Sequence, residues 1–131
     1  MRKKVTARRP ELLEALIDGD SVRVDRMLSE GTDPNVRDSA GWTALHFAAE
    51  RQDAALIERL LATGAEVDVA DEFGNTPLWR AVFTYRNGSA EPIRALLAAG
   101  ADRHRPNTNS VSPMTLAETI ANYDARAILR D

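Results

Sequence analysis

The chain has 131 residues, enough for one domain that buries roughly two-thirds of the surface its unfolded form would expose. Its net charge of −3 gives no overall attraction to nucleic acid or to an anionic membrane. The absence of cysteine excludes disulfides and thiolate chemistry, and it favours an intracellular, cytoplasmic protein. Because aromatic residues make up only 5% of the sequence, alanine and leucine must supply most of the core, which favours packed helices over a sheet sandwich.

The N-terminal residues 1–8 carry a cluster of basic side chains. The stretch that follows contains Glu11, Glu14 and Asp18 and has no apolar core, so we do not expect this start to act as a secretory signal peptide. No apolar run in the sequence reaches the length of a membrane span. We expect residues 1–8 to form a disordered basic tail, or alternatively a docking arm, before a single domain at 9–131.

Four pairs of helices are predicted along the rest of the sequence. The pairs are 10–19 with 21–30, 44–51 with 54–63, 77–85 with 91–99, and 113–122 with 124–130. Thr43, Thr76 and Ser112 are suited to cap the first helices of the last three pairs, because a hydroxyl accepts a hydrogen bond from a free backbone N–H. Pro77 and Pro113 then occupy the first helical position, where a missing N–H costs nothing.

Glycine residues mark the ends of these pairs. Gly31, Gly64 and Gly100 follow the second helices, where a left-handed residue is usual. Gly41 and Gly74 lie in the turns between pairs, where a positive φ is needed. The step from Gly31 to Gly64 is 33 residues and the step from Gly64 to Gly100 is 36, so the pattern repeats and one repeat carries three extra residues.

A hexapeptide recurs at the same period, at 43–48, at 76–81 and in degenerate form at 112–117. These segments resemble the T-P-L-H-x-A signature of the ankyrin repeat. The resemblance covers nearly the whole sequence and implies an all-α solenoid of about four stacked helix-turn-helix repeats with short turn tips, complete as it stands. The expected repeats are 9–37, 38–70, 71–106 and 107–131, with the first and the last as caps.

The resemblance also assigns structural roles within each repeat. His46 stands where the family has a histidine that hydrogen-bonds to neighbouring backbone and connects repeats. Trp79 takes that place in the next repeat, so side-chain bulk must replace the hydrogen bond between the third and fourth repeats. The residues with structural roles are Thr43, Leu45, His46, Ala48, Gly64, Thr76, Pro77, Leu78, Ala81 and Gly100.

Members of this family usually bind proteins through the turn tips and the concave face of the first helices, so the resemblance implies a protein partner. We expect Trp42 and Phe73, at equivalent positions of adjacent repeats, to form one ridge that anchors the partner, because aromatic residues are frequent hot spots. Arg37, Arg51 and Arg86 would orient the partner. Alternatively, Trp42 packs over a neighbouring turn and binds nothing. The complete predicted site is Arg37, Ser39, Trp42, Glu50, Arg51, Glu72, Phe73, Asn75, Phe83, Thr84, Tyr85 and Arg86.

Two irregular segments offer further contacts. The segment 82–92 holds the three extra residues and the turn sequence Asn87-Gly88-Ser89, and it forms either a second contact or an extended helix followed by a harmless loop. The segment 103–109 is basic and then polar, and it suits an acidic partner or a phosphate, or is a solvated loop.

Enzymatic activity is not expected. The sequence has no cysteine, no Gly-rich phosphate loop, no metal-ligand spacing and no Gly-x-Ser-x-Gly elbow, so no catalytic residue, cofactor or metal site is predicted. Asp68 and Asp71 are interpreted as turn residues and not as a catalytic pair of carboxylates. Nucleic acid is disfavoured as a partner, because acidic residues are interspersed among the arginines. The favoured function is therefore that of a monomeric protein-binding module. It would act either as an adaptor or regulator, or as an immunity-type inhibitor of a toxin or enzyme. The alanine- and arginine-rich composition favours a bacterial source.

Overall fold

The computed structural model describes residues 9–120 and 123–130. The predicted basic tail at 1–8, and residues 121–122 and 131, lie outside this part of the protein. Within the described ranges the regular structure is helical: α1 (Glu11–Ile17), α2 (Ser21–Ser29), α3 (Ala44–Glu50), α4 (Ala54–Ala62), α5 (Pro77–Thr84), α6 (Glu91–Ala98), α7 (Pro113–Thr119) and α8 (Tyr123–Arg130). The prediction of an all-α fold with four helix pairs is confirmed, and the predicted helix bounds differ from these by three residues at most.

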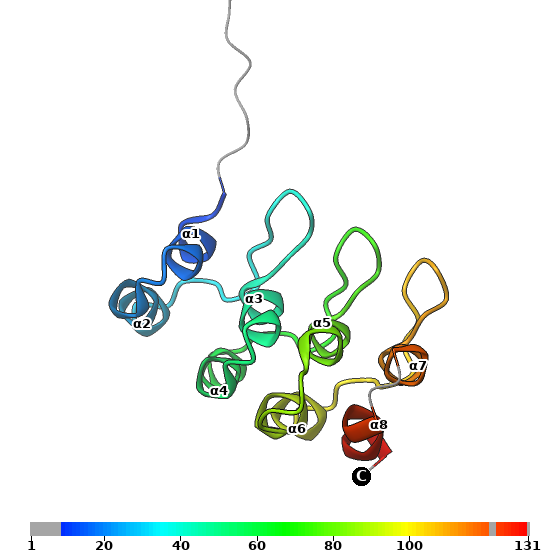
Figure 1. Cartoon of the computed structure of the whole chain (residues 1–131). Helices are drawn as coiled ribbons and strands as arrows, with labels where there is room; N and C mark the ends of the chain where they lie inside the picture. Colours follow the sequence, from blue (N-terminus) through cyan, green and yellow to red (C-terminus); the bar gives the residue numbers. More distant parts are fainter. Residues whose placement is uncertain (1–8, 121–122, 131) are drawn as a thin grey trace, which may run out of the picture.

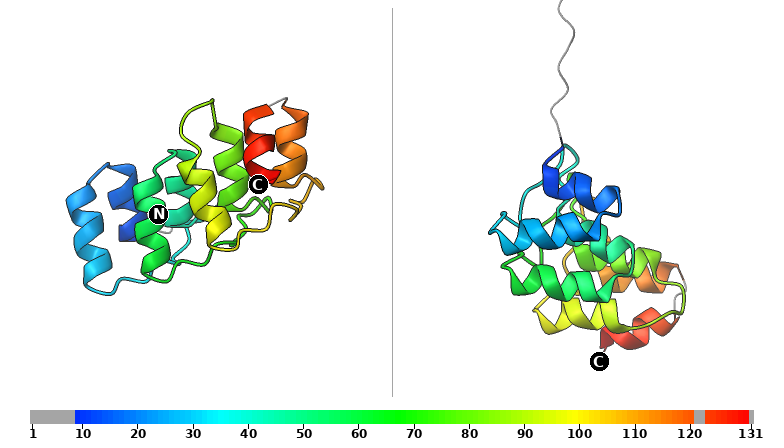
Figure 2. Two further views of the ribbon diagram at one scale, coloured as in Figure 1. Left: turned by 90° about the horizontal axis from the view of Figure 1, so that it is seen from below. Right: turned by 90° about the vertical axis from the view of Figure 1, so that its left-hand side faces the viewer.

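The four pairs stack side by side in sequence order (Figure 1). The first helices of the pairs, α1, α3, α5 and α7, form an inner layer, and the second helices, α2, α4, α6 and α8, form an outer layer. Figure 2 shows the same stack from two further directions. The loops before α3, α5 and α7 project from the inner layer like three fingers, and we call residues 38–42, 71–75 and 107–111 the finger loops.

Leucine and alanine fill the space between the two layers, as the low aromatic content predicts. Leu45 and Leu78 of the inner layer and Leu60 of the outer layer are at most 1% exposed. Ala48 and Ala81, which follow the leucines on α3 and α5, are 0% exposed. Small side chains at these positions let neighbouring inner helices approach closely, so the core is continuous from repeat to repeat.

The helix caps follow the predicted pattern. The side-chain oxygens of Thr43, Thr76 and Ser112 accept hydrogen bonds from the backbone N–H three residues on, at 3.4, 3.3 and 3.1 Å. Pro77 and Pro113 are the first residues of α5 and α7. These caps place α3, α5 and α7 directly after their finger loops, so the base of every finger loop is fixed to the start of a helix.

The finger loops stack on one another through their backbones. The N–H of Glu72 donates to the carbonyl of Ala40 at 2.9 Å, and the N–H of Thr108 donates to the carbonyl of Phe73 at 2.9 Å. Gly74 lies in the second contact with a φ of +80°, and a Cβ atom there would come within 2.9 Å of the Thr108 nitrogen. Glycine is therefore needed at this position both for its backbone conformation and for the close approach.

Substitution of Gly74 by alanine is expected to lower the free energy of unfolding by more than about 1 kcal/mol, because the Cβ atom strains the backbone and separates the second and third finger loops. Denaturant unfolding measures the loss. Gly88 is the matched control, because its φ is not in the positive range and a Cβ atom there meets nothing within 4 Å. Equal unfolding midpoints for the two alanine variants would contradict this account of Gly74.

A second row of contacts ties the loops that leave the outer helices. The Asn35 side chain accepts a hydrogen bond from the N–H of Glu66 at 2.8 Å, and the Asp68 carboxylate, 33 residues further on, accepts one from the N–H of Asp102 at 3.1 Å. Burial raises the pKa of the Asp68 carboxyl above its ordinary value, and the Asp102 N–H and the charge of Arg105 offset only part of this effect. An ionised Asp68 therefore stabilises the folded protein less than a neutral hydrogen-bond acceptor at the same position would.

Substitution of Asp68 by asparagine is expected to raise the melting temperature at pH 7, because the amide oxygen still accepts from Asp102 while the cost of burying a charge is removed. The folded-state pKa of Asp68 exceeds its unfolded value, so the cost of ionisation appears as the pH rises and is absent in acid. The gain should therefore vanish near pH 3. The reverse exchange, Asn35→Asp, is the control and should lower the melting temperature at pH 7.

Candidate interaction surface

An arginine surrounded by aromatic rings joins the second and third repeats on the inner layer. The Cζ atom of Arg80, on α5, lies 5.0 Å from the ring centroid of Trp42, 5.0 Å from that of Phe83 and 5.7 Å from that of Trp79. The Arg80 guanidinium also pairs with the carboxylate of Glu50 on α3. At these distances the rings attract the cation. We call the group the aromatic cluster, and it consists of Trp42, Phe47, Glu50, Trp79, Arg80 and Phe83.

The rings of the cluster also hold one another in place. Trp79 and Phe83 are four residues apart on α5 and stack with centroids 5.4 Å apart and an interplanar angle of 17°. Trp42 tilts against Phe47 at 4.9 Å and 56°. The Phe83 side chain is nevertheless 40% exposed. The cluster is therefore an ordered apolar surface, and a partner that covers it loses little entropy in fixing these side chains.

One hydrogen-bond pattern recurs in the three finger loops and identifies their equivalent residues. In each loop the N–H of the first residue donates to the carbonyl of the fifth residue at 2.9–3.0 Å. By this pattern Trp42 is equivalent to Asn75, and Phe73 is equivalent to Ala40. The prediction that Trp42 and Phe73 occupy equivalent positions is therefore wrong. Trp42 lies at the base of its finger against α3, whereas Phe73 is in the middle of the next finger loop and is 58% exposed.

Two residues of the predicted site are buried, so they cannot contribute to a surface that contacts a partner. Asn75 is 7% exposed, and its Oδ1 atom accepts a hydrogen bond from Nδ2 of Asn107 at 2.9 Å. Tyr85 is 4% exposed, and its hydroxyl donates to the carbonyl of Gly88 at 3.2 Å. Both side chains form hydrogen bonds within this protein. Asn75 links two finger loops, and Tyr85 links two parts of the loop that follows α5.

The three arginines expected to orient a partner all donate to carbonyls of this protein. Arg37 donates to Ala70 and Arg51 donates to Leu16, in each case in a neighbouring repeat. Arg86 donates from Nη1 to two carbonyls at the end of α5, at 2.9 and 2.8 Å. The stack therefore uses these guanidinium groups to satisfy backbone acceptors between and at the ends of helices.

The remaining predicted residues outside the aromatic cluster are at least partly exposed. Ser39, Glu72 and Phe73 are exposed on the finger loops, and Thr84 is half-buried with its hydroxyl donating to the carbonyl of Arg80 at 3.0 Å. We call the finger-side surface, where a partner is expected to bind from the sequence, the binding face. It consists of Ser39, Trp42, Phe47, Glu50, Glu72, Phe73, Arg80 and Phe83.

The sequence prediction did not include Phe47 or Arg80 in the site. They occupy the same place in successive hexapeptides, 33 residues apart, and each lies three residues before a predicted site residue, Glu50 and Phe83 respectively. Residues three apart on a helix share one side of it. That spacing is the signal in the sequence that would have identified both.

His46 connects the second and third repeats as the resemblance implies. Its Nδ1 atom accepts from the N–H of Thr43 at 3.1 Å, so Nε2 carries the proton and donates to the carbonyl of Asn75 at 2.8 Å. Burial lowers the pKa of His46 from its ordinary value, and the hydrogen bond to Asn75 opposes this only in part. The indole Nε1 of Trp79, in the equivalent place, is buried and has no acceptor within 9–120 and 123–130. Hydrogen bonds between the finger loops join the third and fourth repeats instead, from Asn107 to Asn75 and from Thr108 to Phe73.

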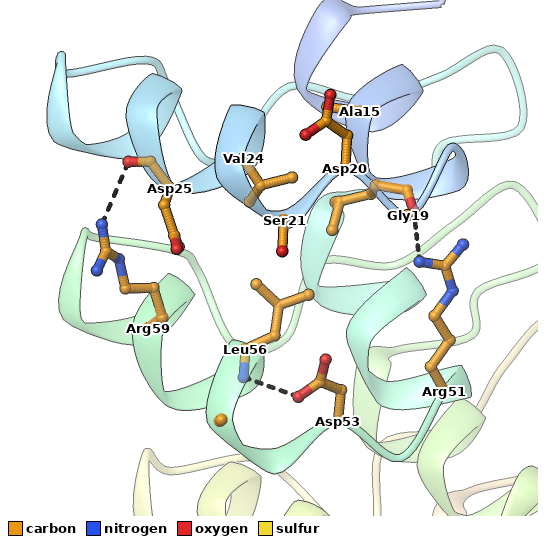
Figure 3. Close-up of a pocket in the computed structure, with 12 residues that line it drawn as sticks. Ala15, Gly19, Asp20, Ser21, Val24, Asp25, Arg51, Asp53, Leu56 and Arg59 are labelled. Carbon is orange, nitrogen blue, oxygen red and sulfur yellow. Dashed lines mark hydrogen bonds between the residues drawn. The ribbon is translucent and has the colours of Figure 1, made fainter.

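A groove of about 350 Å³ lies between the first two helix pairs, lined by α2, α4 and the end of α1 (Figure 3). Leu16, Val24 and Leu56 contribute apolar surface to it. Its polar rim is engaged within the protein, because Asp53 accepts from the N–H of Leu56 at 3.1 Å and Arg59 donates to the hydroxyl of Ser29 at 3.1 Å. Of the predicted site residues Arg51 alone lines the groove, so the groove is separate from the binding face.

No helix in the described ranges is both long and apolar enough to cross a membrane. Within the same residues, no group of three or more histidine, aspartate or glutamate side chains is placed to hold a metal ion.

Comparison with known proteins identifies the family. A family model for ankyrin repeats in three copies matches residues 12–110. A segment of 47 residues is 49% identical to "Ankyrin repeat domain-containing protein 46" of Rattus norvegicus, covering 36% of this chain and 21% of that protein. Over 99 residues, or 73% of this chain, it is 34% identical to the "Mitochondrial disaggregase" of Homo sapiens, of which it covers 13%. The chain thus spans about a fifth or less of the length of these relatives. It belongs to the ankyrin-repeat family, whose members are generally protein-interaction modules.

Proposed function

We propose that this protein is a non-enzymatic, monomeric binding module that holds another protein against its binding face. The observation that carries the proposal is the aromatic cluster, in which Phe83 is 40% exposed, together with Phe73 of the second finger loop, which is 58% exposed. Aromatic residues, phenylalanine among them, and arginine are enriched in protein interfaces relative to the rest of the surface. The rings are already ordered around Arg80, which reduces the entropy lost on binding.

The charges on the binding face suit a partner with apolar and mixed polar contacts. Glu50 neutralises Arg80, and Glu72 adds a negative charge on the second finger loop. Arg37, Arg51 and Arg86 donate to backbone carbonyls of the same protein. A continuous basic surface of the kind that holds nucleic acid is not supported by this distribution, so a protein is the favoured partner.

Further proposals concern the role of the complex, the source organism and the cellular compartment of the protein. An adaptor or regulator and an immunity-type inhibitor both fit the binding face, and affinity separates them, because an inhibitor binds one partner very tightly. The bacterial source proposed from composition has no support from the relatives named above, which are animal proteins. A cytoplasmic location rests on the absence of cysteine.

The experiment that tests the proposal is capture of partners from a lysate of the source organism, read by mass spectrometry. The baits are the wild type, the double variant Phe73→Ala/Phe83→Ala and the control Val22→Ala, whose side chain is 74% exposed on α2 of the outer layer. A stoichiometric protein retained by the wild type and the control and lost from the double variant is the expected result. Equal retention by all three baits would contradict the proposed surface.

A further inference from the structure

The loop between α5 and α6 contains an asparagine followed by glycine at Asn87-Gly88. Both residues are exposed, and Asn87 has a positive φ of 59°, which asparagine tolerates better than most residues. A Cβ atom built at Gly88 would meet nothing within 4 Å. The peptide bond between the two residues is therefore open to solvent and unobstructed.

Neither reacting group of this pair is hydrogen-bonded to a residue that the structure describes. Within residues 9–120 and 123–130, the side-chain amide of Asn87 and the backbone N–H of Gly88 have no hydrogen-bond partner. The Gly88 carbonyl, by contrast, accepts from the Tyr85 hydroxyl at 3.2 Å. The Asn87 side chain and the following nitrogen are therefore free to approach each other.

The other described asparagines lack this combination. The side chains of Asn35 and Asn75 are hydrogen-bonded to neighbouring repeats, and the side chain of Asn107 accepts from two N–H groups of its own finger loop. Asn109 is exposed, but the N–H of the next residue, Ser110, donates to the carbonyl of Asn107 at 2.9 Å. Among the described asparagines, only Asn87 combines a free amide with a free following N–H, and only Asn87 precedes a glycine.

We propose that Asn87 is a site of spontaneous modification in the folded protein, with water as the only reagent. The deprotonated nitrogen of Gly88 attacks Cγ of Asn87, the new bond closes a five-membered succinimide, and the bond between Cγ and Nδ2 of Asn87 breaks to release ammonia. Water then opens the ring at either carbonyl and gives aspartate or isoaspartate. The net change is hydrolysis of an amide to a carboxylate and ammonium, with no oxidation or reduction.

The modification changes the loop that follows α5, the helix that carries Phe83 in its last turn. It places a negative charge beside Arg86, near the carbonyl end of α5, where a helix disfavours negative charge. The isoaspartate form also lengthens the backbone by one carbon between residues 87 and 88, which displaces the Gly88 carbonyl from Tyr85. Phe83 of the binding face lies in the last turn of α5, four residues before the modified position.

The test is incubation of the folded protein at neutral pH and 37 °C, followed by digestion with trypsin. Cleavage after Arg86 and Arg94 releases residues 87–94, in which the amide-to-acid change is read by mass and isoaspartate is separated from aspartate by chromatography. We expect conversion at Asn87 to be at least about tenfold faster than at Asn109, because glycine alone leaves the attack unhindered.

Gly88→Ala is the matched variant, because the added methyl group fits without contact yet hinders the attacking nitrogen. It should slow conversion by at least about tenfold while leaving the melting temperature unchanged. Conversion of Asn87 no faster than that of Asn109 in the folded wild type would overturn the proposal, as would an equal rate in the Gly88→Ala variant. Neither measurement involves a partner, so the result is independent of the proposed function.

Discussion

Substitution of His46 by alanine is expected to lower the free energy of unfolding by about 2–4 kcal/mol. The side chain is 0% exposed, and its removal leaves a cavity between α3 and the second finger loop. The change also removes the reciprocal cap with Thr43 and leaves the carbonyl of Asn75 without its buried donor. Urea unfolding with an unchanged slope measures the loss. A loss below about 0.5 kcal/mol, on the order of a surface substitution, would contradict the role assigned to His46.

The same histidine should make stability depend on pH. The folded-state pKa of His46 is lowered, so the unfolded protein binds more protons as the pH falls below about 6.5, and the free energy of unfolding falls with it. His46→Gln is the control, because glutamine at this position still completes the cap but does not titrate. The wild type should lose stability between pH 7 and pH 5 more steeply than this variant. Parallel curves would show that another group is responsible.

Phe73→Ala combined with Phe83→Ala is expected to weaken binding of the captured partner by at least about 2 kcal/mol, or roughly 30-fold in Kd. Both rings are exposed in the free protein, so their removal subtracts contact area from an interface without opening a core cavity. Isothermal titration of the purified pair measures the effect. Unfolding midpoints recorded alongside separate a loss of contact from a loss of folded protein.

Val22→Ala is the matched control for this measurement. Val22 is 74% exposed on α2, in the layer away from the finger loops, and its truncation removes a similar kind of apolar surface. The Kd of this variant should equal that of the wild type. A loss in Val22→Ala as large as that in the double variant would place the interface on the outer layer.

Local chemistry explains why the fold was predictable from the sequence. Hydroxyl caps at Thr43 and Thr76 and left-handed glycines such as Gly64 act within a few residues of their own position, so the sequence around them contains the whole signal. His46 was also predictable, because the motif includes both the histidine and the threonine that fixes its orientation.

The binding face was only partly predictable, because its contacts depend on distant residues. Arg51 donates to a carbonyl 35 residues away and Arg37 to one 33 residues away. No local pattern in the sequence therefore distinguishes an arginine that binds the protein's own backbone from one that is available to a partner. The position of Arg80 among three rings depends on the packing of α5 against α3. Phe73 belongs to the site predicted from the sequence, and this residue is exposed, but the loop hydrogen bonds match Phe73 with Ala40 and not with Trp42.

Hydrogen exchange of the complex, read by mass spectrometry, tests the proposed binding face most directly. The account predicts slower exchange on binding in the finger loops 38–42 and 71–75 and in α3 and α5, with unchanged exchange in α2 and α4. Protection confined to α2 and α4 would contradict it, because the partner would then occupy the outer groove and not the binding face.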